Sequence, residues 1–244
     1  MPRIRLDQRV TELGLAPSRE RARALVLAGQ VLVDGHPVTK AGSPIPADAT
    51  VTLATPDHPW VGRGGVKLAH ALDTFQVPVA GRQALDIGAS TGGFTDVMLQ
   101  RGAAHVVALD VGHGQFDWTL RNDPRVTVVE GFNARALTPA DLPHPMDLVA
   151  IDVSFISLRH ILPVLPPILT PGADVVALVK PQFEAGRAEV KKGVIRDEAV
   201  HARVVDEIAA AGAALGLTRM ATTPSPITGA QGNREFFLHF RQRP

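Results

Sequence analysis

The chain has 244 residues, of which 45% are hydrophobic and 20% charged, and its formal net charge is +1. This composition excludes a disordered chain and fits one sizeable core with a small additional domain. The absence of cysteine excludes disulfides, thiol nucleophiles and thiolate metal sites, and because the nine histidines are scattered we predict no metal site. No stretch approaches the roughly 18 to 20 consecutive apolar residues that cross a bilayer, and the N-terminus has no signal-peptide core. We therefore expect a cytoplasmic protein that does not bind membranes.

The first 40 residues are locally basic, with seven arginines and lysines against four carboxylates. Apolar residues at helical spacing predict a helix over residues 5–13 and a second one that starts after Ser18 and ends before Gly29. Four arginines of these helices could grip successive phosphates of a nucleic acid: Arg5, Arg9, Arg19 and Arg23. A solvated charged face is the alternative.

Short strands are predicted next, over residues 31–33 and 51–53, with a hairpin turn at Asp34-Gly35. Two short helices followed by Gly-Gln-Val-Leu-Val-Asp-Gly resemble the S4 RNA-binding domain. The resemblance implies an α+β RNA-binding domain over residues 1–58, and a small cap that packs on the main domain is the alternative. Two prolines then predict a linker, in which we expect Trp60 to be buried at the junction.

Residues 59–244 alternate apolar strands with helical stretches after a first helix that leads from Lys67 to Phe75. This alternation predicts an α/β fold, a Rossmann-like doubly wound parallel sheet. The last two strands have no helix between them, so we expect an antiparallel pair at the edge. The predicted strands are 83–87, 105–110, 126–130, 148–152, 174–180, 217–224 and 234–240.

A turn of small residues, Gly-Ala-Ser-Thr-Gly-Gly, follows the first strand of this domain and predicts a cofactor loop. Ser90 stands where the dinucleotide fingerprint requires glycine, and Asp86 would repel a pyrophosphate, so the loop favours S-adenosylmethionine over a nicotinamide cofactor. Asp110, at the end of the second strand, could hold the ribose diol. The predicted cofactor-binding residues are Asp86, Gly88, Ser90, Thr91, Gly92, Gly93, Phe94, Asp110, Asn133 and Asp152.

Four charged residues complete the pattern, because Lys67, Asp152, Lys180 and Glu235 resemble in chain order the Lys-Asp-Lys-Glu tetrad of FtsJ-like ribose 2′-O-methyltransferases. Together with Arg-Gly-Gly-Val-Lys-Leu, Asp-Val-Ser-Phe-Ile-Ser, Val-Lys-Pro-Gln-Phe-Glu and Gly-Asn-Arg-Glu-Phe, they make the chain similar to the TlyA, or haemolysin A, family of ribosomal RNA methyltransferases. The resemblance implies methyl transfer from S-adenosylmethionine to the ribose 2′-hydroxyl of cytidine in ribosomal RNA, either of the large subunit alone or of both subunits. Ribosomal RNA or ribosomal subunits would be the partners.

The tetrad suggests a division of roles, with Lys180 as the base, Lys67 holding the hydroxyl, Asp152 orienting Lys180 and Glu235 fixing a lysine. Taken singly, three of them have simpler explanations: a helix cap for Asp152, and surface charges for Glu235 and Lys67.

Other features allow two interpretations. His113 and Trp118 could lie near the adenine or simply pack, and Arg187, Lys191 and Lys192 could form a basic loop at the substrate entrance or a solvated run of charge. Two rival functions are a non-catalytic RNA-binding assembly factor and a membrane-lytic haemolysin. The oligomeric state stays open.

Overall fold

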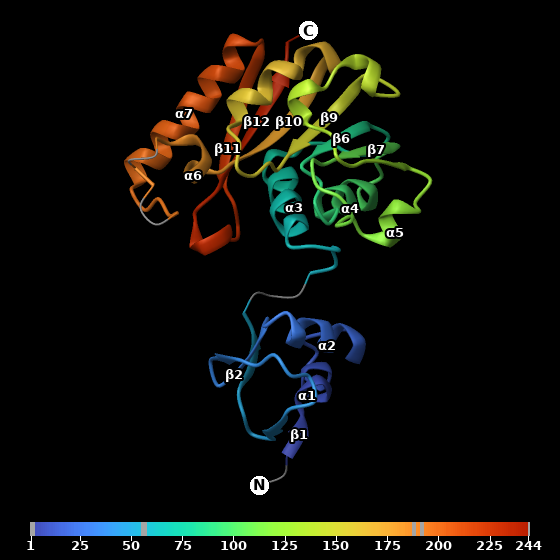
Figure 1. Cartoon of the computed structure of the whole chain (residues 1–244), viewed down its shortest axis with the longest axis vertical. Coiled ribbons are helices and arrows are strands. Elements are labelled where there is room, and N and C mark those ends of the chain that lie inside the picture. The colour runs from blue at the N-terminus through green and yellow to red at the C-terminus, as the bar shows by residue number, and fades with distance from the viewer. Residues whose placement is uncertain (1–2, 55–57, 187–188, 191–192, 244) are drawn as a thin grey trace. The chain divides into compact units, whose positions relative to one another are not determined.

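The computed structural model describes residues 3–54, 58–186, 189–190 and 193–243. The chain divides into two compact units, Met1–Pro59 and Trp60–Pro244 (Figure 1). This division lies one residue beyond the predicted boundary at residue 58. Each unit is described by itself below.

The N-terminal unit packs two helices against short strands around a small core that includes Leu6, Val10 and Val31. Ser18 caps the second helix by accepting from the N–H of Arg21, as its place in the sequence predicts. Asp34 and Gly35 both have positive φ, 49° and 81°, which a type I′ turn requires. The helices are α1 (Leu6–Glu12) and α2 (Arg19–Leu27), and the strands are β1 (Arg3–Arg5), β2 (Val31–Val33), β3 (His36–Pro37), β4 (Pro44–Pro46) and β5 (Val51–Leu53).

Two of these strands were not predicted, because β1 and β4 are three residues long and too short to carry a periodic pattern. They pair antiparallel, while β3, β2 and β5 form a separate sheet in that order. Arg5 therefore ends a strand, and the expectation that it begins the first helix is wrong.

The main unit is built on a seven-stranded sheet in the order β11-β12-β10-β9-β6-β7-β8. The chain order reverses between β6 and β9, which is where the carboxyl ends of parallel strands leave a crevice for ligands. The strands are β6 (Gln83–Ile87), β7 (His105–Leu109), β8 (Val126–Val129), β9 (Met146–Ile151), β10 (Leu169–Val179), β11 (Leu217–Pro224) and β12 (Phe236–Gln242).

The last two strands form an antiparallel pair at one edge of the sheet, as predicted. Within this pair, β12 lies between β10 and β11 and pairs with both, so β11 is the outer strand of the two. A hairpin pattern in a sequence shows that two strands pair with each other and does not show which of them joins the sheet. Strand β12 begins at Phe236, two residues later than predicted, so Glu235 precedes it.

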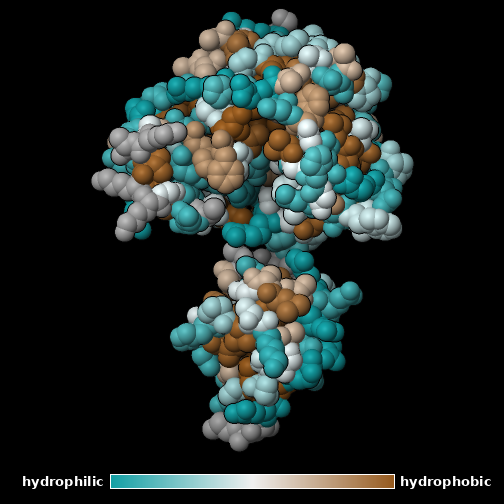
Figure 2. Space-filling view, in the orientation of Figure 1, coloured by the Kyte–Doolittle hydropathy of each residue, from teal (hydrophilic) through white to brown (hydrophobic). Residues whose placement is uncertain are grey.

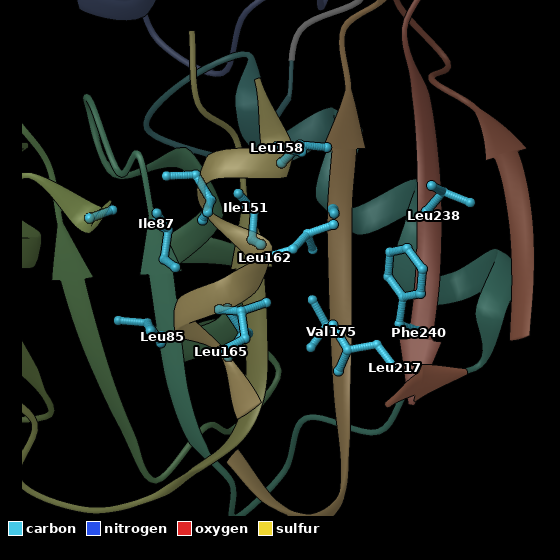
Figure 3. Packing of buried hydrophobic residues seen from close by; sticks show 14 of the residues in the cluster. Leu85, Ile87, Ile151, Leu158, Leu162, Leu165, Val175, Leu217, Leu238 and Phe240 are labelled. Atoms are coloured by element: carbon cyan, nitrogen blue, oxygen red, sulfur yellow. The ribbon is translucent and has the colours of Figure 1, made fainter. Parts of the chain in front are cut away.

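Two apolar layers cover the sheet. On one face lie α3 (Gly64–Phe75), α4 (Gly93–Gln100) and α5 (Trp118–Arg121), with Trp60 half-buried among their side chains. On the other face lie α7 (Glu198–Ala214) and the 3₁₀ turns of residues 158–168, where Leu158, Leu162 and Leu165 point toward the strand residues Ile87 and Ile151 (Figure 3). Prolines in this connection between β9 and β10 prevent a regular helix.

Candidate active site

The glycine loop after β6 lies against the backbone that follows β9. Gly88 has φ 87°, and a Cβ atom there would stand 2.4 Å from the carbonyl oxygen of Asp152, so no side chain fits. Gly92 has φ 95°, and a Cβ atom there would stand 2.6 Å from Leu120. These contacts explain why the loop needs glycine at both positions.

A cavity of about 510 Å³ opens at the carboxyl ends of the strands. Asp110 stands at its rim, where its two carboxylate oxygens accept from the backbone N–H groups of Ser90 and Gly112, both at 2.7 Å. Because a carboxylate offers about four acceptor positions, Asp110 keeps capacity for a ligand. Five of the ten predicted cofactor residues, Gly88, Ser90, Asp110, Asn133 and Asp152, line the cavity, and Asp86 does not.

Apolar side chains form much of the remaining wall, among them Leu109, Phe132 and Ile161. On the face of the main unit shown in Figure 2, apolar side chains are exposed near the middle and polar ones surround them. A molecule with a flat apolar ring and a polar sugar would suit such a lining.

The other predicted cofactor residues support the loop from behind. Asp86 is fully buried and accepts from Thr95 Oγ1 at 2.7 Å. Burial raises the pKa of Asp86 to about 7, against the hydrogen bond from Thr95, and the charge of Asp152 adds to the rise. Thr91, Gly92 and Gly93 do not line the cavity, and Phe94 packs in the core, tilted against Phe237.

Just beyond the ends of β9 and β10, a first ion pair joins Lys180 to Asp152. Nζ of Lys180 lies 2.5 Å from Oδ1 of Asp152 and donates to Oγ of Ser154 at 2.8 Å. Lys180 is buried, whereas Asp152 and Ser154 both line the cavity. The ammonium thus has two polar partners on one short segment.

A second ion pair joins residues that are 168 positions apart in the sequence. Nζ of Lys67, on α3, donates to Oε2 of Glu235 at 2.6 Å, and both side chains are largely buried. Gly229 leaves the room for this carboxylate, because a Cβ atom there would stand 2.0 Å from its Oε1.

The two ion pairs are neighbours because of strand register. Val179 of β10 pairs with Phe236 of β12 in an antiparallel ladder, so the next step brings Lys180 opposite Glu235. Residues directly opposite in an antiparallel pair point to the same face. The four charged residues that sequence order suggested therefore converge at one end of the sheet.

Phe155 is the residue that sequence reasoning missed. It follows Ser154, has φ 64° and lines the cavity. Its side chain is 91% exposed, and the centroid of its ring lies 5.1 Å from that of Phe183. A left-handed backbone and an exposed ring are both costly for a phenylalanine, and such strain gathers at functional sites. Its place directly after Asp-Val-Ser was the signal that could have found it.

Of the residues that the sequence left with two interpretations, Trp118 and His113 do not line the cavity. Trp118 is 74% exposed and does not line the cavity, so it neither packs nor borders that space. The ring of His113 fills the space beside Gly131, because a Cβ atom on Gly131 would stand 2.4 Å from Cε1 of that ring. Arg187, Lys191 and Lys192 lie outside the described residues.

In the N-terminal unit, two of the predicted RNA-binding arginines share one buried carboxylate. Asp7 lies 2.8 Å from Nη2 of Arg5 and 3.3 Å from that of Arg19, and the hydrogen bond from Arg5 is the main reason that its pKa falls to about 2. Arg9 lies 3.8 Å from Glu12. Arg23 is exposed on α2 and has no ion pair within the described part of the chain.

Neither a membrane span nor a metal centre is found in the part of the chain that the structure describes. None of its helices is long and apolar enough to cross a bilayer, and none of its His, Asp and Glu side chains form a group of three or more that could hold a metal ion.

Comparison with known proteins gives two family matches. The FtsJ-like methyltransferase family matches residues 60–242, and the S4 domain matches residues 4–51. The chain is 48% identical over 241 residues to the 16S/23S rRNA (cytidine-2′-O)-methyltransferase TlyA of Mycobacterium tuberculosis, covering 98% of this chain and 90% of that protein. It is 32% identical over 183 residues to the 23S rRNA (cytidine-2′-O)-methyltransferase TlyA of Campylobacter jejuni, covering 74% and 70%. A solved structure from Streptococcus thermophilus, described as a hemolysin, is similar with a TM-score of 0.79 at 43% identity, covering 100% and 90%.

Proposed function

We propose, from the premise that this chain belongs to the FtsJ-like methyltransferase family and carries an S4 domain, that it methylates the ribose 2′-hydroxyl of cytidine in ribosomal RNA. The observation that carries the proposal is the convergence of Lys67, Glu235, Lys180 and Asp152 as two short ion pairs at the carboxyl ends of the strands. Large-subunit RNA is the substrate that we propose first, with small-subunit RNA as a second one. Such an enzyme would act in the cytoplasm, where ribosomes are assembled.

The cavity residues fit S-adenosylmethionine as the methyl donor. Asp110 keeps acceptor positions for the ribose diol, while Leu109 and Ile161 offer apolar surface to the adenine. Asn133 uses Oδ1 to accept from the N–H of Arg135 at 3.1 Å and borders the cavity with the rest of its amide. When bound, this cofactor supplies a methyl group on a positively charged sulfur. Asp152 borders the same space.

Asp86, Thr91, Gly92, Gly93 and Phe94 would serve the cofactor indirectly. The hydrogen bond between Thr95 and Asp86 ties the end of β6 to α4, and the glycines let the intervening loop turn tightly. We infer that these residues hold the loop in the shape that Gly88 and Ser90 present to the ligand.

The chemistry needs a group that removes a proton, because a ribose hydroxyl is a weak nucleophile. The bound cofactor would supply the methyl group to the ribose oxygen, and Nζ of Lys180, in its neutral form, would accept the proton that the hydroxyl gives up. Asp152, 2.5 Å away, orients the amine and stabilises the ammonium that forms. Lys67, held by Glu235, directs positive charge toward the hydroxyl oxygen as it gains negative charge.

Phe155 offers a surface for the target base. A nucleotide whose ribose reaches Lys180 must leave its stack, and an exposed aromatic ring beside the cavity can replace the lost stacking. The arginines of the N-terminal unit, Arg5, Arg9, Arg19 and Arg23, would bind phosphates of the same RNA.

The test is methyl transfer from labelled S-adenosylmethionine to ribosomal RNA. The product should be 2′-O-methylcytidine by mass spectrometry of the digested RNA, which distinguishes ribose from base methylation. Lys180→Ala should lower the rate about 10²-fold to 10⁴-fold, the usual worth of general base catalysis, while cofactor affinity stays unchanged.

Arg125→Ala is a matched control, because that arginine forms a surface pair with Asp123. Normal turnover by Lys180→Ala would refute the base assignment. An absence of any methylated cytidine with the wild-type protein would refute the function.

A further inference from the structure

Ser154 makes a hydrogen bond with Lys180 in addition to the ion pair of that lysine with Asp152. The residue stands between the acid of the first ion pair and the exposed Phe155, and its Oγ accepts from Nζ of Lys180 at 2.8 Å. Asp152 Oδ1 lies 2.5 Å from the same nitrogen. One buried amine is therefore held from two directions by side chains that both line the cavity.

Two polar neighbours have a definite effect on an amine that must take up a proton. A neutral lysine amine has two N–H groups and one lone pair in tetrahedral arrangement. With only the nearby carboxylate of Asp152, the amine can rotate about the Cε–Nζ bond among orientations that keep the two groups close. With Ser154 accepting one N–H group, that rotation is restricted, and the lone pair is left fewer directions.

The contact between Ser154 and Lys180 is held by the surrounding structure. Glu184 lies on α6 (Pro181–Glu184), the helix that begins directly after Lys180. It accepts from Ser157 Oγ at 2.5 Å and from the N–H of Leu158 at 2.8 Å. The segment after β9 is thus tied to the segment after β10 three residues away from Ser154.

We propose that Ser154 is a positioning residue, which directs the lone pair of Lys180 toward the ribose hydroxyl by accepting one of its N–H groups. The inference rests on the proposed function, in which Lys180 is the base. Ser154 contributes through Lys180 and gives up no proton of its own. Its role therefore belongs to the transfer step and leaves cofactor binding untouched.

The sharpest experiment compares Ser154→Thr with Ser154→Val, because these side chains have nearly the same shape and only threonine has a hydroxyl. Single-turnover methylation of ribosomal RNA is measured at saturating S-adenosylmethionine, together with the cofactor Kd and the melting temperature. We expect the threonine variant to react within about threefold of wild type, and the valine variant about tenfold more slowly, the rate equivalent of one hydrogen bond to a charged group. The cofactor Kd should be the same for both.

Ser154→Ala covers the case in which added bulk disturbs the turn, since it removes the hydroxyl and adds nothing. It should be as slow as the valine variant. Equal rates for the threonine and valine variants, or an alanine variant as fast as wild type, would overturn the proposal. Those outcomes leave wild-type methylation intact, so they are distinct from a failure of the proposed function, in which the wild-type protein itself forms no 2′-O-methylcytidine.

Discussion

Two buried carboxylates at opposite ends of the central sheet have pKa values that are shifted in opposite directions. Level with the amino ends of β6 and β9, Asp174 in the middle of β10 is fully buried and accepts from Arg82 at 2.6 Å, from His239 Nε2 at 2.7 Å and from Arg241 at 3.1 Å. Burial alone would raise its pKa, but the hydrogen bonds from His239 and Arg82 lower it to about 2. At the carboxyl end of β6, Asp86 is equally buried, and burial raises its pKa to about 7.

The difference lies in the partners. Asp86 has one hydroxyl, from Thr95, and its Oδ1 has no hydrogen-bond partner among the described residues. A buried carboxylate surrounded by cations stabilises the fold, whereas a buried carboxylate with an oxygen that accepts no hydrogen bond destabilises it. The amino end is thus built for stability, and the end that carries the cavity and the two lysine pairs keeps polar groups that are not fully satisfied. That pattern is typical of functional sites.

Removing the charge of Asp174 should have the largest effect on stability. Asp174→Asn removes the charge that three cationic or polar groups share, and loss of one partner of a buried pair costs about 3 to 5 kcal/mol. The measurement is the free energy of unfolding in urea at pH 7. Asp73→Asn is the control, because Asp73 pairs with Arg101 at an exposed site, and it should cost about 0 to 1 kcal/mol.

The difference in unfolding free energy between wild type and Asp174→Asn should depend on pH in a definite direction. The depressed pKa of Asp174 means that its contribution is complete above the ordinary value of 3.8 and is lost as the pH falls toward about 2. The difference between wild type and Asp174→Asn should therefore shrink over that range. A constant difference would show that the charge of Asp174 is not what stabilises this end.

The carboxyl end should respond in the opposite direction. The folded chain keeps a proton on Asp86 up to about pH 7, whereas the unfolded chain loses it near 3.8, so stability falls as the pH rises between these values. Asp86→Asn removes this loss. The free energy of unfolding of Asp86→Asn, minus that of wild type, should therefore be up to about 4 kcal/mol larger at pH 8 than at pH 4, so the variant gains stability over wild type as the pH rises. Urea unfolding at both pH values measures this, and an equal difference at both would contradict it.

The sequence predicted the functional end of the sheet better than the stable end. Strands that are buried on both faces, such as Gln83–Ile87, are continuous apolar runs, so the residues that end them could be named in advance. Partners that are distant in sequence leave no local pattern. Family resemblance grouped Lys67 with Glu235 but did not say which lysine Glu235 pairs with, and the arginines around Asp174 and the insertion of β12 were not foreseen. Phe155 was missed because an exposed, strained aromatic ring looks in a sequence like any loop residue.

Substitutions at the cavity should change cofactor affinity and have a smaller effect than those on stability. Asp110→Ala should raise the Kd for S-adenosylmethionine about tenfold to hundredfold, since it removes charged hydrogen bonds to the ribose diol. Asp86→Asn should change that Kd by less than about threefold, because Asp86 does not line the cavity. Isothermal titration of each variant measures the contrast. Equal losses for the two variants would mean that Asp86 contacts the cofactor, as its position in the sequence suggested.

The smallest effect extends the comparison to the N-terminal unit, where Asp7 engages Arg5 and Arg19 but not Arg23. An arginine without an internal partner can give its whole charge to a phosphate, so Arg23→Gln should weaken binding of a ribosomal RNA fragment about threefold at low salt. It should also reduce the slope of log affinity against log salt by about 1, because one fewer counterion is released. Fluorescence anisotropy at several KCl concentrations gives both quantities, with Arg125→Gln as the surface control. An unchanged slope would exclude Arg23 from the RNA interface and leave the arginines that Asp7 orients as the phosphate contacts of this unit.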